Sequence, residues 1–149
     1  MTAYDLASRY IGIHELGTGD HPLIQWWLSL CGFPTDVKDE TPWCSAFMNG
    51  IAWELRLPRS KSAAARSWLG VGTPITLREA HAANDVVILT RGEGVQPDAS
   101  VLNAIGHVGL FASFDPAVRV VNVLAGNQGN AVSVLPFDSA RVLGVRRLA

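Results

Sequence analysis

Residues 41–57 have the sequence TPWCSAFMNGIAWELRL and predict the central helix of the protein. Thr41 is a favourable N-cap, and Pro42 suits the first helical position. The segment then runs to Leu57 with Gly50 as its one weak helix former, and Pro58 follows at once. Apolar side chains recur at intervals of three and four residues, which is typical of a face packed in a core: Cys44, Phe47, Met48, Ile51, Ala52 and Leu55.

The segments before this helix predict further helices, and the segments after it predict strands. We expect helices over residues 3–11 and over residues 20–31, the second capped by Asp20, and a short helical piece over residues 62–69. Strands are expected over residues 86–89, 108–112, 118–124, 132–135 and 142–148, with a turn at Asp115-Pro116. This order predicts an α+β fold in which N-terminal helices pack on a C-terminal antiparallel β-sheet.

Length and composition fit one globular domain over residues 1–149. Hydrophobic residues make up 48% of the chain and charged residues 17%, and the net charge is −1. Because no strong positive field is present, nucleic acid is not an expected partner. No apolar run approaches the roughly 18 residues of a membrane span, and the N-terminus lacks the pattern of a secretory signal. Positive residues cluster only locally, at residues 56–66 and 141–147, which is typical of a solvated surface.

The two cysteines have different surroundings, and we expect both to be free thiols. Cys31 belongs to the apolar stripe of the second helix, so it is interpreted as a small buried hydrophobic residue. Cys44 falls near the third position of its helix, where free N–H groups and the helix dipole favour a thiolate. A thiolate is the nucleophile of cysteine hydrolases. Cys44 also belongs to an apolar stripe, so position alone leaves both roles open.

A base for Cys44 is predicted at His107, which opens the strand Gly106-His107-Val108-Gly109. Gly109 shares a strand face with His107, which predicts open space beside the imidazole. The next strand should end at the same edge of the sheet, at the segment 126–130. There Asn127 is the candidate to fix the imidazole tautomer, and Gln128 is its rival. We expect Cys44 and His107 to form a thiolate–imidazolium pair.

Three motifs together resemble the NlpC-type and CHAP cysteine peptidases and amidases, closest to their small phage-lysin branch. The motifs are residues 39–47 (DETPWCSAF), residues 106–111 (GHVGLF) and residues 126–129 (GNQG); residues 11–24 also look like the start of that branch. The resemblance implies a papain-like fold and hydrolysis of an amide bond in the stem peptide of peptidoglycan. It implies Cys44 as nucleophile, His107 as base and Asn127 as the orienting residue.

The resemblance carries further expectations. Substrate contacts are expected at motif residues Trp43, Asp39, Gly106 and Gln128. No cofactor or metal is expected, and the protein is expected to be a monomer. It should be made in the cytoplasm without a signal peptide and reach the cell wall through a phage holin or a dedicated secretion system. Residues 91–105 form a longer connection than this branch usually has, so we expect this insert to border the active site.

Several alternatives remain open at this point. The same triad would serve an acyltransferase or a secreted antibacterial amidase, and a binding protein without turnover is possible on the same fold. A metallohydrolase is disfavoured because the histidines lack compact ligand spacing. Asp36, Asp39 and Glu40 are candidates for calcium binding, although they lack a loop signature.

Overall fold

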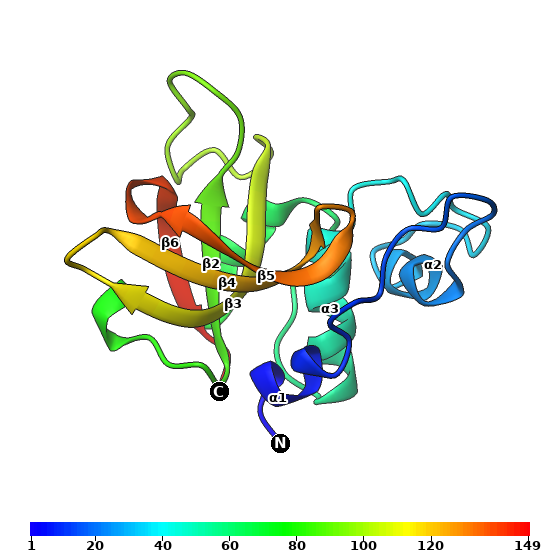
Figure 1. Cartoon of the computed structure of the whole chain (residues 1–149), viewed down its shortest axis with the longest axis horizontal. Helices are drawn as coiled ribbons and strands as arrows, with labels where there is room; N and C mark the ends of the chain where they lie inside the picture. Colours follow the sequence, from blue (N-terminus) through cyan, green and yellow to red (C-terminus); the bar gives the residue numbers. More distant parts are fainter.

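The computed structural model describes residues 1–149 and contains one six-stranded antiparallel sheet (Figure 1). The strand order is β1-β6-β2-β3-β4-β5. The strands are β1 (Thr73–Ile75), β2 (Asp85–Thr90), β3 (Gly106–Asp115), β4 (Val120–Gln128), β5 (Ala131–Asp138) and β6 (Val142–Arg147). The five strands expected from the sequence are all present, so the mixed architecture of helices and antiparallel sheet is confirmed.

Three α-helices precede the sheet in the chain: α1 (Ala3–Ser8), α2 (Pro22–Ser29) and α3 (Cys44–Glu54). Helix α3 packs on β3 and β4, and α2 lies on the outer side of α3 (Figure 1). The piece expected at residues 62–69 is a 3₁₀ helix, η1 (Ala65–Gly70), and two shorter 3₁₀ turns are η2 (Leu77–Glu79) and η3 (Ser139–Arg141). No helix is both long and apolar enough to cross a membrane.

Strand β2 is buried on both faces, which explains its continuous apolar run. Val86 and Ile88 join the core between sheet and helices, whereas Val87 and Leu89 join a second cluster on the opposite face. Strand β3 alternates in the same way: Val108 faces the helices with Leu110. The side chains of His107 and Phe111, at odd positions in the first half of β3, therefore lie on the face away from α3, and the register shift after Phe111 brings Phe114 to that same face.

Helix α3 begins two residues later than predicted, at Cys44 and not at Pro42. Its first helical residue is Cys44, and Trp43 is the N-cap, with φ −128° and no side-chain capping bond. The fully buried indole of Trp43 stacks on Trp27 with 5.8 Å between ring centroids. Because this packing holds Trp43 outside the helix, the helix cannot start at Thr41. Cys44 is consequently the first residue of the first turn rather than the third.

Other boundaries also differ from the sequence prediction. Helix α2 is capped by His21, whose Nδ1 accepts the Leu23 N–H at 3.1 Å, and not by Asp20. The Asp20 carboxylate instead accepts the Asp39 N–H at 2.9 Å. Strand β1 was not predicted, because it has three residues and its middle residue is a proline.

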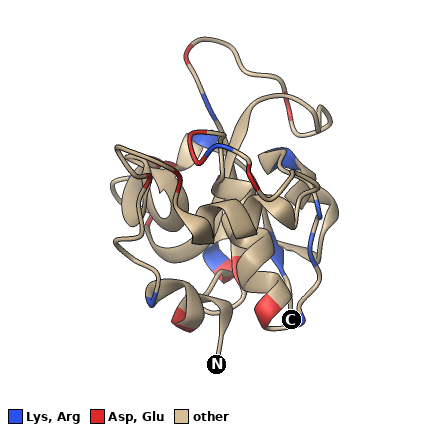
Figure 2. Ribbon diagram, turned by 90° about the vertical axis from the view of Figure 1, so that its right-hand side faces the viewer, with Lys and Arg blue, Asp and Glu red and all other residues tan.

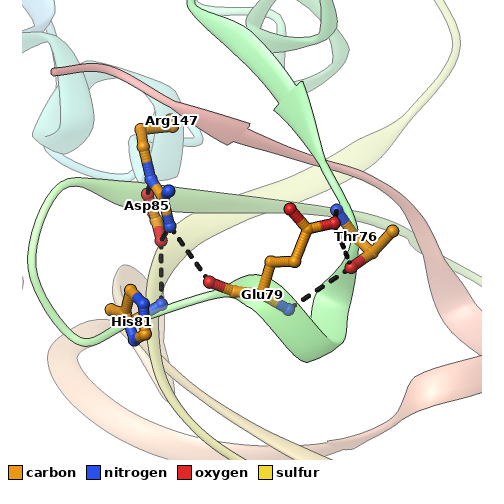
Figure 3. A network of polar contacts seen from close by, with 5 residues as sticks. All are labelled: Thr76, Glu79, His81, Asp85 and Arg147. Carbon is orange, nitrogen blue, oxygen red and sulfur yellow. Dashed lines mark hydrogen bonds and ion pairs between the residues drawn. The ribbon is translucent and has the colours of Figure 1, made fainter.

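An ion pair between neighbouring strands holds the end of the sheet at which β2 begins and β6 ends (Figure 3). The buried Asp85 carboxylate on β2 accepts two bonds from the Arg147 guanidinium on β6, at 2.9 and 2.8 Å. The same carboxylate accepts the His81 N–H at 2.8 Å. Arg147 and the fully buried Arg66 are thus structural, which corrects the expectation that both basic clusters form solvated surfaces.

Candidate active site

The nucleophile candidate lies where α3 meets β3. Cys44 is 4% exposed, and the N–H groups of Cys44, Ser45 and Ala46 have no backbone acceptor because the first helical bond is made by Phe47. Burial raises the pKa of the Cys44 thiol, while the backbone N–H groups of Val108 and Ser45 and the charge of Arg91 act in the opposite direction. The contact with Val108 places the sulfur beside the residue that follows His107.

His107 is the second residue of β3 and is also buried. Its Nε2 lies 2.9 Å from Gln128 Oε1, and its ring centroid lies 5.5 Å from that of Phe137. Burial lowers the pKa of His107 to about 4, and the charges of Arg91 and Arg141 add to this effect. No hydrogen bond connects the imidazole to the Cys44 thiol, and Nδ1 has no partner.

These pKa directions correct the expectation of a preformed ion pair. The thiol is shifted upward from its ordinary pKa and the imidazole is shifted downward, so both groups are neutral near pH 7. A thiol and a neutral imidazole are the forms that these pKa directions favour. A neutral imidazole is the form that can accept a proton.

The partner of His107 is Gln128, not Asn127 as the sequence predicted. An unbroken β4 would place residue 127 on the same face as Ala125, but the register with β5 shifts between Ala125 and Gln128. Asn127 has a left-handed φ of 57°, so this residue is the extra one of a β-bulge. The bulge turns Gln128 to the face on which His107 lies.

The orientation of the Gln128 amide is fixed by its other contacts. Its Nε2 donates to the carbonyl oxygens of Ser133 at 2.8 Å and Val123 at 3.2 Å. The amide oxygen therefore faces His107, and the imidazole Nε2 must carry the proton that joins them. The remaining ring nitrogen, Nδ1, then has a free lone pair.

Strands β3 and β4 separate beside this pair. Their ladder begins at Leu110–Leu124, so the segment Gly106–Gly109 has no paired partner on β4. Gly126 lies against α3, where a Cβ would be 2.7 Å from the Trp43 ring and 2.8 Å from Phe47 Cβ. The space beside Gly109 is filled rather than open: a Cβ there would be 2.5 Å from Val123 Cγ1. Gly109 thus allows close packing by β4, which corrects the sequence interpretation.

Two cavities adjoin the candidate pair. A cavity of about 480 Å³ is lined by Pro42, Cys44, Ala63, Ala64, Ala65, Arg91, Asn103, Ala104, Ile105 and Gly106. A second cavity of about 170 Å³ is lined by Arg91, His107, Asn127, Gln128, Leu135, Phe137 and Arg141. The thiol lines the first cavity and the imidazole the second, and Arg91 lines both. Four residues of the 91–105 insert line the first cavity, so the insert borders the cavity that contains Cys44.

The remaining predicted substrate contacts divide into two groups. Gly106 and Gln128 line the cavities, whereas Trp43 and Asp39 are fully buried and line neither. Asp39 Oδ2 accepts the N–H groups of Leu16 and His21, each at 2.9 Å, so it orders the loop before α2. Asp39 and Trp43 are therefore structural residues. No group of three or more His, Cys, Asp or Glu is arranged to hold a metal ion.

Sequence reasoning missed two arginines of the site. Arg66 is fully buried, and its guanidinium donates to four carbonyl oxygens of the insert, from Pro97, Asp98, Val101 and Ile105, at 2.7–3.3 Å. Arg91 opens the insert and reaches both cavities. The sequence does contain an indication that Arg66 is buried, because it is a single arginine in the otherwise mostly apolar segment between Ala65 and Trp68.

Comparison with known proteins gives similarity of fold. No family model matches the chain, and no curated protein matches it. Among solved structures, NlpC1 from Trichomonas vaginalis is similar, with a TM-score of 0.56 and 16% sequence identity. The match covers 98% of this chain and 42% of that one, so this chain spans less than half the length of its structural neighbour. The similarity supports an NlpC-like fold.

Proposed function

We propose that this protein is a cysteine hydrolase that cleaves an amide bond, with Cys44 as nucleophile, His107 as general base and Gln128 as the residue that orients His107. The observation that carries the proposal is the tautomer of His107. Its Nε2–H is engaged by Gln128 Oε1 at 2.9 Å, which leaves Nδ1 as the proton acceptor, and Cys44 at the start of α3 lines a cavity that shares Arg91 with the cavity of His107.

The proposed reaction starts from neutral groups. His107 Nδ1 takes the proton of the Cys44 thiol as the sulfur attacks the amide carbonyl carbon. The free N–H groups at the start of α3 are suited to stabilise the developing oxyanion. The imidazolium then gives its proton to the leaving amine as the C–N bond breaks. Water hydrolyses the resulting thioester and regenerates the thiol.

We infer that the substrate is the stem peptide of peptidoglycan. Two observations support this choice: the fold is shared with a protein named NlpC1, and the three sequence motifs resemble NlpC-type and CHAP enzymes. The motifs resemble the phage-lysin branch most, so we place the protein among phage or prophage lysins. On this proposal residues 1–149 form one catalytic domain that acts as a monomer.

Digestion of purified peptidoglycan tests the proposal. The wild-type protein should release muropeptide fragments whose masses identify the bond that is cut. Cys44→Ala should release none, whereas Cys31→Ala should retain activity and serves as the matched thiol control. Activity should be lost on alkylation and should survive a chelator. Full activity of Cys44→Ala would contradict the proposal, and transfer of an added amine to the fragments would instead identify an acyltransferase.

A further inference from the structure

Arg91 is a cation without a protein partner at the candidate site. It is exposed, and its guanidinium makes no hydrogen bond or ion pair. It directly follows Thr90, the last residue of β2, so its backbone starts from a fixed strand end. Figure 1 shows the insert that Arg91 opens, as the green loop beyond the ends of β2 and β3.

The charged side chains that line the two cavities are both arginines, Arg91 and Arg141. No carboxylate lines either cavity, although the chain as a whole has a net charge of −1 and charges of both signs are spread over it (Figure 2). The positive character is therefore local to the site.

Arg141 is already engaged within the protein. Its Nε and Nη2 donate to the Thr90 carbonyl at 3.2 and 2.6 Å, and its guanidinium lies 5.2 Å from the Phe137 ring centroid. Arg66 is committed to the carbonyl groups of the insert. Arg66 and Arg141 each keep one terminal nitrogen without a protein acceptor, whereas all donors of Arg91 are free for a ligand.

Arg91 is also central to the site. It lines the cavity that contains Cys44 and the cavity that contains His107, so a group bound to it lies near both. Apart from Cys44 and Asn103, the other residues that line the first cavity are small or apolar, including Ala63, Ala64, Ala65 and Ala104. A guanidinium with free donors beside a mostly apolar cavity is suited to a carboxylate.

We propose that Arg91 is a specificity residue that binds a carboxylate of the substrate next to the scissile amide. The protein would then act on acidic peptides and discriminate against the same peptides when the carboxylate is amidated. This inference deepens the proposed hydrolase function and rests on it, because Arg91 can bind a substrate carboxylate only if the protein acts on such a substrate. The anion preference itself is a property of the Cys44 environment and can be measured without turnover.

Two thiol reagents of nearly equal size test the inference. Iodoacetate carries a carboxylate and iodoacetamide carries the neutral amide, and both alkylate Cys44 by displacement of iodide. We expect the iodoacetate-to-iodoacetamide rate ratio at Cys44, followed by peptide mass spectrometry, to fall about fivefold in Arg91→Ala. Arg91→Lys should retain part of the preference. Salt at 0.5 M should lower the wild-type ratio and leave that of Arg91→Ala unchanged.

Arg78→Ala is the matched control, because Arg78 is exposed on η2, which precedes the far end of β2. The iodoacetate-to-iodoacetamide rate ratio at Cys44 should be the same in Arg78→Ala as in wild type. The same ratio measured at Cys31 should not change in any variant. An equal ratio in wild type and Arg91→Ala would overturn the inference. An anion preference without peptidoglycan cleavage would instead overturn the proposed substrate. A Cys44 that reacts with neither reagent would overturn both proposals.

Discussion

Gln128 Oε1 accepts a hydrogen bond from His107 Nε2 at 2.9 Å, which joins the last residue of β4 to the second residue of β3. This bond spans the place where the two strands have ceased to pair, since their ladder begins at Leu110–Leu124. The Gln128 amide is itself held by the Val123 and Ser133 carbonyls. The imidazole is therefore positioned by a side chain that has little freedom to rotate.

The first prediction concerns this bond. Gln128→Ala should lower kcat about tenfold to a hundredfold with little change in KM, because the imidazole loses its fixed tautomer. Gln128→Glu should restore the acceptor and raise the kinetic pKa of His107 through its negative charge. Asn127→Ala is the neighbouring control and should have a small effect. A large loss in Asn127→Ala with none in Gln128→Ala would show that the bulge does not set the partner.

The second prediction concerns stability at acidic pH. The pKa of His107 is about 4 in the folded protein and 6.5 in its ordinary state, so the unfolded chain binds the extra proton between these values. Stability contributed by neutral His107 is present above pH 6.5 and is lost as the pH falls toward 4. The loss should approach about 3 kcal/mol, since one pKa unit is equivalent to about 1.4 kcal/mol.

Urea unfolding of wild type and His107→Gln between pH 4 and pH 7 measures this contribution. The difference in unfolding free energy between the two proteins should change with pH, since His107→Gln removes the titrating group and retains the others. Parallel pH profiles would contradict a buried neutral His107.

Local sequence patterns predicted which segments form helices and strands, but they did not predict the geometry of the candidate site. Apolar periodicity predicted α3 and the strands from β2 to β6, because each buries a face that the sequence displays. The start of α3 at Cys44 depends on the stacking of Trp43 on Trp27, a contact between segments that periodicity does not report. The choice of Gln128 over Asn127 depends on a bulge, and a bulge reverses every face assignment that follows it.

The third prediction tests the close approach of α2 and α3. A Cβ on Gly50 would lie 2.2 Å from Trp27 Cδ1, so Gly50→Ala should destabilise the protein by about 2 kcal/mol despite the better helix propensity of alanine. Gly70→Ala is the control, since a Cβ there has no atom within 4 Å and its φ is not left-handed. Thermal unfolding of both variants compares them, and a neutral Gly50→Ala would contradict this packing.

The fourth prediction separates the two thiols. Cys31 is partly buried against the main core, and burial raises the pKa of its thiol to about 11. Cys31→Ala should therefore cost about 1 kcal/mol of stability and leave activity unchanged. Cys44→Ala should abolish turnover while the circular dichroism spectrum and cooperative unfolding persist. Loss of activity in Cys31→Ala with a native spectrum would show that the wrong thiol had been assigned.

The last prediction concerns the insert that forms one wall of the larger cavity. Four carbonyl oxygens of residues 97–105 are held by the single guanidinium of Arg66, and a Cβ on Gly106 would lie 2.9 Å from Arg66 Cγ. Arg66→Met keeps an apolar stem but leaves these acceptors without their donor, so the insert should open more readily. Amide hydrogen exchange should rise in residues 92–105 and remain slow in β2 and β3, and KM should rise more than kcat falls. Arg59→Met, which removes a bond to the Leu30 carbonyl outside the site, is the matched control. Uniformly faster exchange across β2 and β3 would instead show that Arg66 supports the whole core and not the cavity wall.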